Sequence, residues 1–107
     1  EYVVGQKFIP KLVRDKIPQI IQEKGRNCKW HRAEIPEYNL RLYDKMCEEL
    51  TEFMEYPCVE EAADMYEVFL SLLTNWGLEL NDVISHAEKK KADRGGFYEG
   101  IVLDTLD

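Results

Sequence analysis

The chain has 107 residues, 45% of them hydrophobic and 33% charged, which is typical of one soluble globular domain spanning 1–107. Its 21 acidic residues outnumber the 14 basic ones, and a net charge of −7 argues against a protein that coats DNA or RNA, because such a protein needs a basic surface. The apolar runs are far shorter than the roughly 20 residues that cross a bilayer, no secretory leader is recognisable, and the cysteines form no C-x-x-C pair. We therefore expect a cytoplasmic protein that binds neither a membrane nor nucleic acid.

Proline and glycine residues divide the sequence into segments with helical periodicity. The pattern predicts an all-α fold with helices at about 15–24, 36–56, 59–76 and 81–94, between an extended lead-in over 1–12 and a tail over 97–107. Asp15 and the pair Asn81-Asp82 are expected to cap the first and last helices, because short polar side chains accept hydrogen bonds from a helix N-terminus. The central helices are joined by about two residues, so we expect them to be antiparallel neighbours in a helical bundle.

Acidic residues gather in the two central helices, over residues 44–67. With about 100° of rotation per residue, Glu49 lies at the margin of the apolar stripe of the first central helix, and Glu52 lies just beyond it. On the second central helix, Glu61 falls inside the apolar stripe and Asp64 at its edge. Two carboxylate pairs are therefore expected to face each other across the seam between the helices.

A carboxylate that points into such a seam needs a partner, because an unpaired buried carboxylate is strongly destabilising or takes up a proton. No lysine or arginine is expected on the acidic half of either stripe, which leaves an internal salt bridge without an obvious cation. Four oxygen ligands without imidazole or thiolate suit Mg²⁺, with Mn²⁺ as a substitute. We therefore predict a metal site formed by Glu49, Glu52, Glu61 and Asp64; the alternative is a solvated acidic face.

Histidine and cysteine residues contribute little to this prediction. A di-iron centre is disfavoured because it requires Glu-x-x-His pairs, and neither His31 nor His86 completes one. We expect both histidines at the surface or hydrogen-bonded elsewhere. Cys47 falls on the apolar stripe and is expected to be a small core residue.

Magnesium on carboxylates usually holds phosphate groups, so basic side chains should lie nearby. Two basic clusters are available, one with Lys11, Arg14 and Lys16 and one with residues 89–94. Arg14 and Arg94 are the better candidates, because a guanidinium fork matches phosphate oxygens. No P-loop or Rossmann glycine motif is present.

Three motifs resemble those of a known family. EELTE at 48–52 followed by EAAD at 61–64 resembles the E-E-x-x-E … E-x-x-D signature of MazG-like all-α nucleoside triphosphate pyrophosphohydrolases. KLVRDKIP at 11–18 resembles the opening motif of the small MazG-like and phosphoribosyl-ATP-pyrophosphohydrolase-like proteins, and RGGF at 94–97 with IVL at 101–103 resembles their closing motif. The resemblance covers roughly residues 8–103.

The resemblance implies hydrolysis of a nucleoside triphosphate between its α- and β-phosphates, with Mg²⁺, by a homodimer or homotetramer. It implies that the four predicted carboxylates are metal ligands and that Glu48 and Glu49 act in catalysis, Glu48 by orienting or deprotonating the attacking water. Lys91 and Arg94 correspond to basic residues that meet phosphates, beside Lys11 and Arg14.

Two other functions stay open at this point. A phosphoribosyl-ATP pyrophosphohydrolase of histidine biosynthesis would use the same carboxylates on a different nucleotide. A non-enzymatic acidic helical interaction module would need only a solvated acidic face, which the position of Glu61 on its helix argues against. The wide apolar stripes also predict a homo-oligomer, because a chain of this length cannot easily cover them alone.

Overall fold

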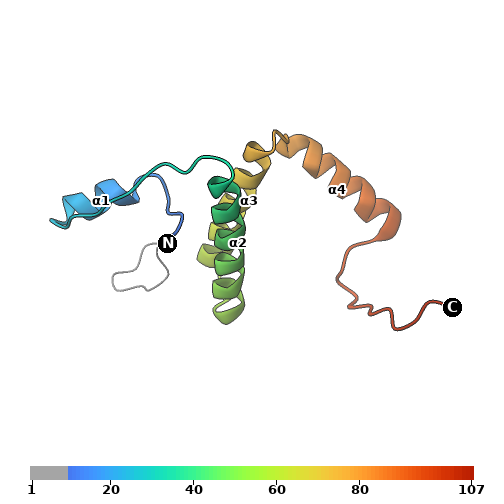
Figure 1. The fold of residues 1–107 in the computed structure, drawn as a ribbon. Coiled ribbons are helices and arrows are strands. Elements are labelled where there is room, and N and C mark those ends of the chain that lie inside the picture. Colours follow the sequence, from blue (N-terminus) through green and yellow to red (C-terminus); the bar gives the residue numbers. More distant parts are fainter. Residues whose placement is uncertain (1–9) are drawn as a thin grey trace. The chain divides into compact units, whose positions relative to one another are not determined.

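The computed structural model describes residues 10–107, and over this range the fold is all-α, as predicted. Its helices are α1 (Ile17–Glu23), α2 (Glu37–Glu55), α3 (Val59–Asn75) and α4 (Leu80–Arg94), with no strand among the described residues (Figure 1). The part of the predicted lead-in over residues 1–9 lies outside the described residues. The chain divides into two compact units, the first ending at Leu72 and the second spanning Leu73–Asp107.

α1 is a short helix whose start is determined by proline. Lys16 occupies the N-cap position without a side-chain hydrogen bond to the helix, so the prediction of Asp15 as the cap is wrong. Pro18 stands in the first turn, where its fixed φ angle favours helix and its missing N–H is not needed. Ile17 and Ile21, one turn apart, are the buried residues of α1, and the helix is followed by Gly25 with a φ of 79°.

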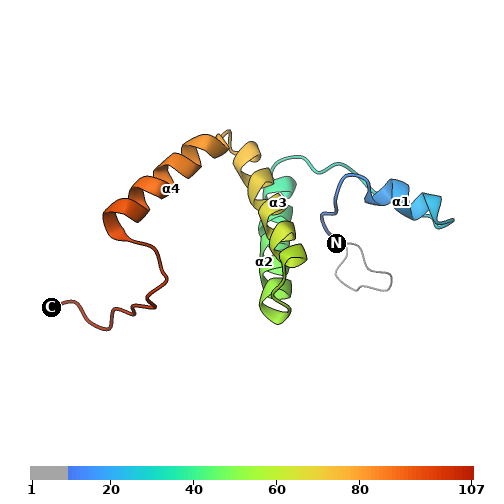
Figure 2. The same ribbon diagram turned by 180° about the vertical axis from the view of Figure 1, so that it is seen from behind.

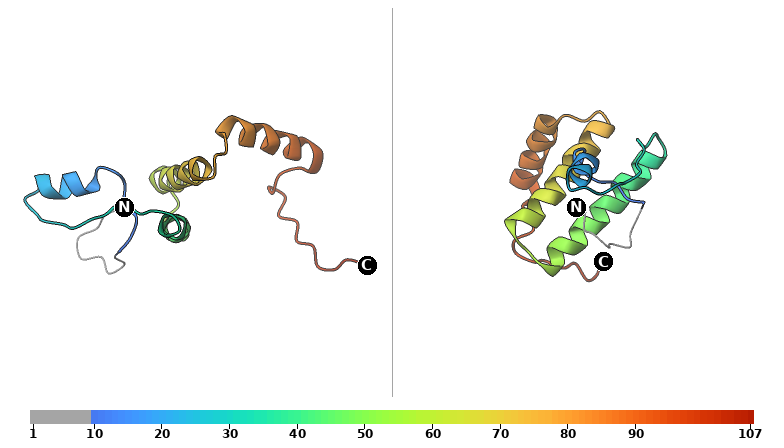
Figure 3. Two further views of the ribbon diagram at one scale, coloured as in Figure 1. Left: turned by 45° about the horizontal axis from the view of Figure 1, so that its top comes forward. Right: turned by 90° about the vertical axis from the view of Figure 1, so that its left-hand side faces the viewer.

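α2 and α3 lie side by side and run in opposite directions, as all views agree (Figures 2 and 3). Pro57 stands in the short turn between them, where it cannot continue α2. Leu42 of α2 is fully buried and Val68 of α3 nearly so, which places the apolar seam between these two helices. The predicted antiparallel pair is therefore present.

Only part of the apolar stripe of α2 is buried. Tyr43, Leu50 and Met54, on its far side, are between 47% and 69% exposed. Cys47 is exposed as well, so its prediction as a core residue is wrong. One antiparallel neighbour covers only the edge of a stripe that faces it, and α3 leaves the far edge of α2 in contact with solvent.

The second unit contains the end of α3, α4 and the C-terminal tail. α4 begins at Leu80 with Glu79 at the N-cap position and no side-chain cap, so the predicted Asn81-Asp82 cap is wrong. Asp82 lies instead in the first turn, where its negative charge still suits the helix dipole. Residues 97–107 form no regular helix or strand and are exposed. No helix within residues 10–107 has the length and apolar character needed to cross a bilayer.

Candidate metal centre

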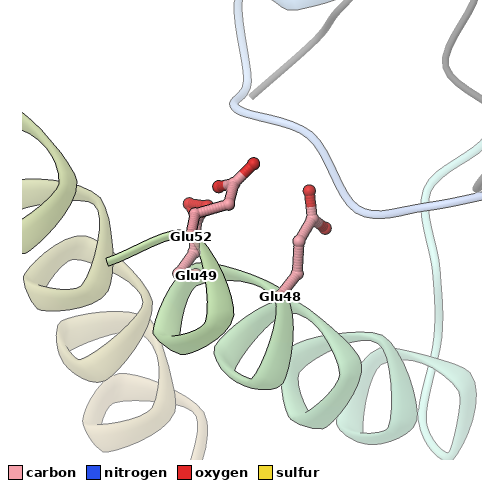
Figure 4. Close-up of side chains that lie close together, drawn as sticks. All are labelled: Glu48, Glu49 and Glu52. Carbon is pink, nitrogen blue, oxygen red and sulfur yellow. The ribbon is translucent and has the colours of Figure 1, made fainter. Parts of the chain in front are cut away.

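Three glutamates on one turn of α2 form the first part of the site. Glu48, Glu49 and Glu52 each offer a carboxylate oxygen, and these oxygens all lie within 4.8 Å of one another. Glu52 follows Glu48 by four residues and Glu49 by three, so it neighbours both on the helix surface, and the three side chains point to the same side (Figure 4).

Glu49 also belongs to a second group that bridges the two central helices. Its carboxylate and those of Glu61 and Asp64, from α3, lie within 4.8 Å of one another. The structure therefore brings together all four predicted metal ligands through Glu49, which belongs to both groups. The antiparallel arrangement of α2 and α3 is what carries the EELTE and EAAD motifs to the same level of the seam.

The centre of the site contains two carboxylate oxygens without a partner. Glu49 is only 1% exposed, and its Oε1 atom has no hydrogen-bond partner in the described part of the chain. The Oε2 atom of Glu61 is also buried and also has no hydrogen-bond partner among the described residues. Buried polar atoms in folded proteins are almost always satisfied, so these two oxygens are unusual, and a cation bound between the helices would give them a partner.

The electrostatics of the site agree with this interpretation. Burial, a hydrogen bond to Glu52 and the charge of Glu52 raise the pKa of Glu49 to about 7, although the charge of Lys45 acts in the opposite direction. Burial first, and then the charges of Glu52, Asp64 and Glu60, raise the pKa of Glu61. Without a cation the central carboxyl groups thus retain protons more strongly than ordinary glutamates do.

Glu48, at the edge of the site, is held by two lysines. Lys11 Nζ donates to Glu48 Oε2 at 3.1 Å, and Lys45 Nζ lies 3.5 Å from Glu48 Oε1. Burial alone would raise the pKa of Glu48, but the hydrogen bond from Lys11 and the charges of both lysines outweigh it and lower the pKa. At a pH at which Glu49 still holds its proton, Glu48 is therefore already ionised.

Lys45 is the residue that sequence reasoning missed. Its side chain is 8% exposed, and it supplies the positive charge on the acidic side of α2 that we did not expect. Lys45 precedes Glu49 by four residues, so the two residues occupy nearly the same helical face, and this spacing was a signal that could have identified it.

Asp64, at the opposite edge, is paired with the segment that precedes α1. Arg14 Nη2 donates to Asp64 Oδ1 at 2.8 Å, across 50 residues of sequence. Arg14 is 44% exposed at its side chain and Asp64 is 18% exposed. Two of the predicted phosphate-binding residues, Lys11 and Arg14, thus each contact a predicted site carboxylate.

A cavity of about 750 Å³ lies beside the glutamates of α2. Lys11, Arg41 and Lys45 line it together with Glu48 and Glu52. This volume is in the range of pockets that hold small organic ligands. The cavity combines cationic side chains with the carboxylates of the candidate metal site, which suits a ligand that brings both a metal ion and anionic groups.

The histidines take no part in the site, as expected. His31 Nε2 lies 3.0 Å from a carboxylate oxygen of Glu37, and His86 Nδ1 lies 3.1 Å from the main-chain oxygen of Asp82. Lys91 and Arg94 belong to α4 in the second unit, where the Lys91 Nζ atom lies 5.2 Å from the centre of the Tyr98 ring. Their contact with phosphate stays a prediction.

Comparisons with known proteins add no relative. No protein-family model matches the chain, and searches of curated proteins and of solved structures find no match. The resemblance to the MazG-like family therefore rests on the three sequence motifs, and the function is argued from the site.

Proposed function

We propose that the chain is a Mg²⁺-dependent nucleoside triphosphate pyrophosphohydrolase, with Mn²⁺ able to replace Mg²⁺. The observation that carries the proposal is the group of Glu49, Glu61 and Asp64, whose carboxylates each offer an oxygen within 4.8 Å of the others, while Glu49 Oε1 and Glu61 Oε2 are buried and have no partner among the described residues. A solvated acidic face would leave these oxygens in water, so the burial argues against a purely surface role.

The donor atoms fit a hard divalent cation. Glu49, Glu52, Glu61 and Asp64 would hold it, since all four offer oxygen and the site contains neither imidazole nor thiolate. The metal ion would neutralise phosphate charge and lower the pKa of a bound water.

The residues around the metal ligands have separate tasks in hydrolysis. The oxygen of a water molecule forms a bond to phosphorus, the bridging bond between the α- and β-phosphates breaks, and the products are a nucleoside monophosphate and pyrophosphate. Glu48 is kept ionised by its two lysine partners, and it orients this water and accepts its proton. Reactions of this type depend mainly on positioning and charge neutralisation, so no covalent nucleophile is required.

Basic side chains account for the binding of a triphosphate next to so many carboxylates. Lys11, Arg41 and Lys45 line the cavity, and Arg14 lies at the other edge of the site. Phosphate oxygens accept hydrogen bonds from Lys and Arg as carboxylate oxygens do. These side chains can therefore leave their carboxylate partners and bind the phosphates of the substrate. The family resemblance adds Lys91 and Arg94 as further phosphate contacts.

The proposal includes membership of the MazG-like family and assembly as a homodimer or homotetramer. The exposed apolar side chains on the far edge of α2, Tyr43, Leu50 and Met54, support an assembly in which another surface covers them.

The direct test is an assay of purified protein with a panel of ribo- and deoxyribonucleoside triphosphates and phosphoribosyl-ATP, in which monophosphate and pyrophosphate are both measured. We expect equal amounts of the two products, in a reaction that requires Mg²⁺ or Mn²⁺. Preference for phosphoribosyl-ATP would assign the enzyme to histidine biosynthesis.

The matched variants for this assay are Glu61→Gln and Glu60→Gln. Glu61 contributes a buried site oxygen, whereas its neighbour Glu60 is exposed, so only the first change should reduce the rate by orders of magnitude. Glu61→Gln should also gain less thermal stability from Mg²⁺ than the parent does, because it binds the ion more weakly. Absence of metal-dependent pyrophosphate release from every nucleotide, or equal behaviour of the two variants, would refute the proposed function.

A further inference from the structure

Arg14 pairs with one of the carboxylates that would hold the proposed metal ion. Its Nη2 atom lies 2.8 Å from Asp64 Oδ1, and the Asp64 carboxylate belongs to the group formed with Glu49 and Glu61. The guanidinium pairs with Asp64, while Glu49 Oε1 and Glu61 Oε2, from the other two carboxylates of the group, have no hydrogen-bond partner within residues 10–107.

A guanidinium and a divalent cation cannot share this carboxylate freely. At 2.8 Å the Arg14 donor is in direct contact with Asp64 Oδ1, so a metal ion held by this carboxylate would bind directly beside the guanidinium. Two cations held at the same carboxylate also repel each other strongly where water is partly excluded. A metal ion that uses Asp64 must therefore displace Arg14 or accept a poorer position.

We infer that Arg14 is a stand-in cation, which pairs with Asp64 in the absence of metal and competes with the metal ion for that carboxylate. This inference rests on the proposed function. A nucleotide relieves the competition, because its phosphate oxygens offer the displaced guanidinium a partner of the same geometry as a carboxylate. Metal and nucleotide then bind better together than the metal binds alone, and Arg14 couples the two.

The segment that carries Arg14 supports this role. Lys11 and Arg14 are three residues apart, and they contact Glu48 on α2 and Asp64 on α3 respectively. Arg14 is the more exposed of the two, at 44% against 9%, so its side chain can leave its carboxylate with less rearrangement. Lys11 remains to hold the segment in place.

The test measures binding of Mn²⁺ alone, from the electron paramagnetic resonance signal of the free ion, to the parent protein and to Arg14→Ala. We expect Arg14→Ala to bind Mn²⁺ about twofold to fivefold more tightly, which is the range that loss of a partly exposed ion pair provides. Arg14→Lys, which keeps the charge but loses the planar fork, should lie between the two. With saturating metal, turnover of nucleotide should nevertheless fall in Arg14→Ala, because the phosphate contact is lost.

The control is Arg26→Ala, which removes the same charge from an exposed residue of the same unit and should leave Mn²⁺ affinity unchanged. Repeating the measurement in about 1 M KCl, where the Debye length is about 3 Å, screens long-range charge effects and should reduce the difference between parent and Arg14→Ala without abolishing it. Unchanged or weaker Mn²⁺ binding by both Arg14 variants would overturn the inference and leave the proposed function standing. Failure of the parent itself to bind Mn²⁺ would overturn the proposed function, and the inference with it.

Discussion

Replacing Glu49 by Gln tests whether the centre of the site destabilises the metal-free protein. Glu49 is 1% exposed, and its pKa is raised from 4.5 to about 7. Glutamine keeps the shape of the side chain but carries no charge at any pH. The variant should therefore be more stable than the parent at alkaline pH, and the advantage should disappear in acid.

The magnitude follows from the two pKa values. Between pH 4.5 and about 7 the unfolded chain releases the Glu49 proton while the folded protein retains it, so the free energy of unfolding decreases over this window as the pH rises. At about 1.4 kcal/mol for each pKa unit, the full loss is about 3 kcal/mol, and about 2 kcal/mol of it falls between roughly pH 5.5 and 8. Below pH 4.5 both states hold the proton and the group has no effect.

Urea unfolding at both pH values, with chelator present, measures this difference. The parent should lose about 2 kcal/mol more than Glu49→Gln between roughly pH 5.5 and 8. Addition of Mg²⁺ at the higher pH should stabilise the parent more than the variant, because the ion replaces the proton as the partner of the carboxylate.

Glu60→Gln serves as the control, because its side chain is exposed on the helix that carries Glu61. Its stability should depend on pH nearly as that of the parent does, because the charge of Glu60 is the weakest of the three that raise the pKa of Glu61. If Glu49→Gln and Glu60→Gln have parallel stability curves, the central carboxyl group is not perturbed in solution and the reasoning from its burial is wrong.

Two further predictions concern charge and assembly. Lys45→Met keeps most of the apolar stem but removes the charge beside Glu48, and urea unfolding should show a free energy of unfolding lower by about 1–3 kcal/mol. The control Lys90→Met, at an exposed residue, should change this free energy by less than about 0.5 kcal/mol. Equal effects of the two substitutions would contradict the role of Lys45. Sedimentation equilibrium at micromolar concentration should find a dimer or larger assembly, because Tyr43 and Met54 are exposed on α2, and a monomer would contradict this expectation.

The helices could be predicted from the sequence because their limits depend on local chemistry. Apolar periodicity and the positions of proline and glycine located all four helices to within about two residues. The caps were predicted wrongly at both α1 and α4, where Lys16 and Glu79 stand at the cap positions without side-chain bonds. Which polar side chain reaches a helix terminus depends on how the chain approaches it, and composition does not specify that path.

The sequence predicted which carboxylates lie close together, but not which of them is the most buried. Helical position placed Glu61 inside the apolar stripe and Glu49 at a margin, yet Glu49 is the carboxylate that is 1% exposed. The position of a residue on one helix does not show which edge of the apolar stripe the neighbouring helix will cover. Lys45 lies four residues before Glu49, so its place on the helix could be predicted, but the burial of its charge beside Glu48 depends on where its four-carbon stem carries it.

The pairs formed by the N-terminal segment lie beyond any local pattern. Lys11 meets Glu48 across 37 residues, and Arg14 meets Asp64 across 50. The sequence led us to expect phosphate contacts for these basic residues, because magnesium on carboxylates usually holds phosphate groups and a guanidinium fork matches phosphate oxygens. Only the tertiary structure shows that the same side chains already pair with the carboxylates of the site.

In the described part of the chain, the carboxylates at the edges of the site have partners that those at its centre lack. Glu48 and Asp64, at the two edges, are paired with lysine and arginine, whereas Glu49 and Glu61, at the centre, retain oxygens without partners among the described residues. A salt-bridge network that served stability alone would satisfy the most buried carboxylate first, because desolvation costs it the most. Here Glu49, the most buried carboxylate, has a raised pKa and reduces the stability of the folded protein. A cation bound to Glu49 would restore that stability. A divalent ion at the centre accounts for both the unpartnered oxygens and the cationic edges, since the edges then stay available for the phosphates that such an ion accompanies.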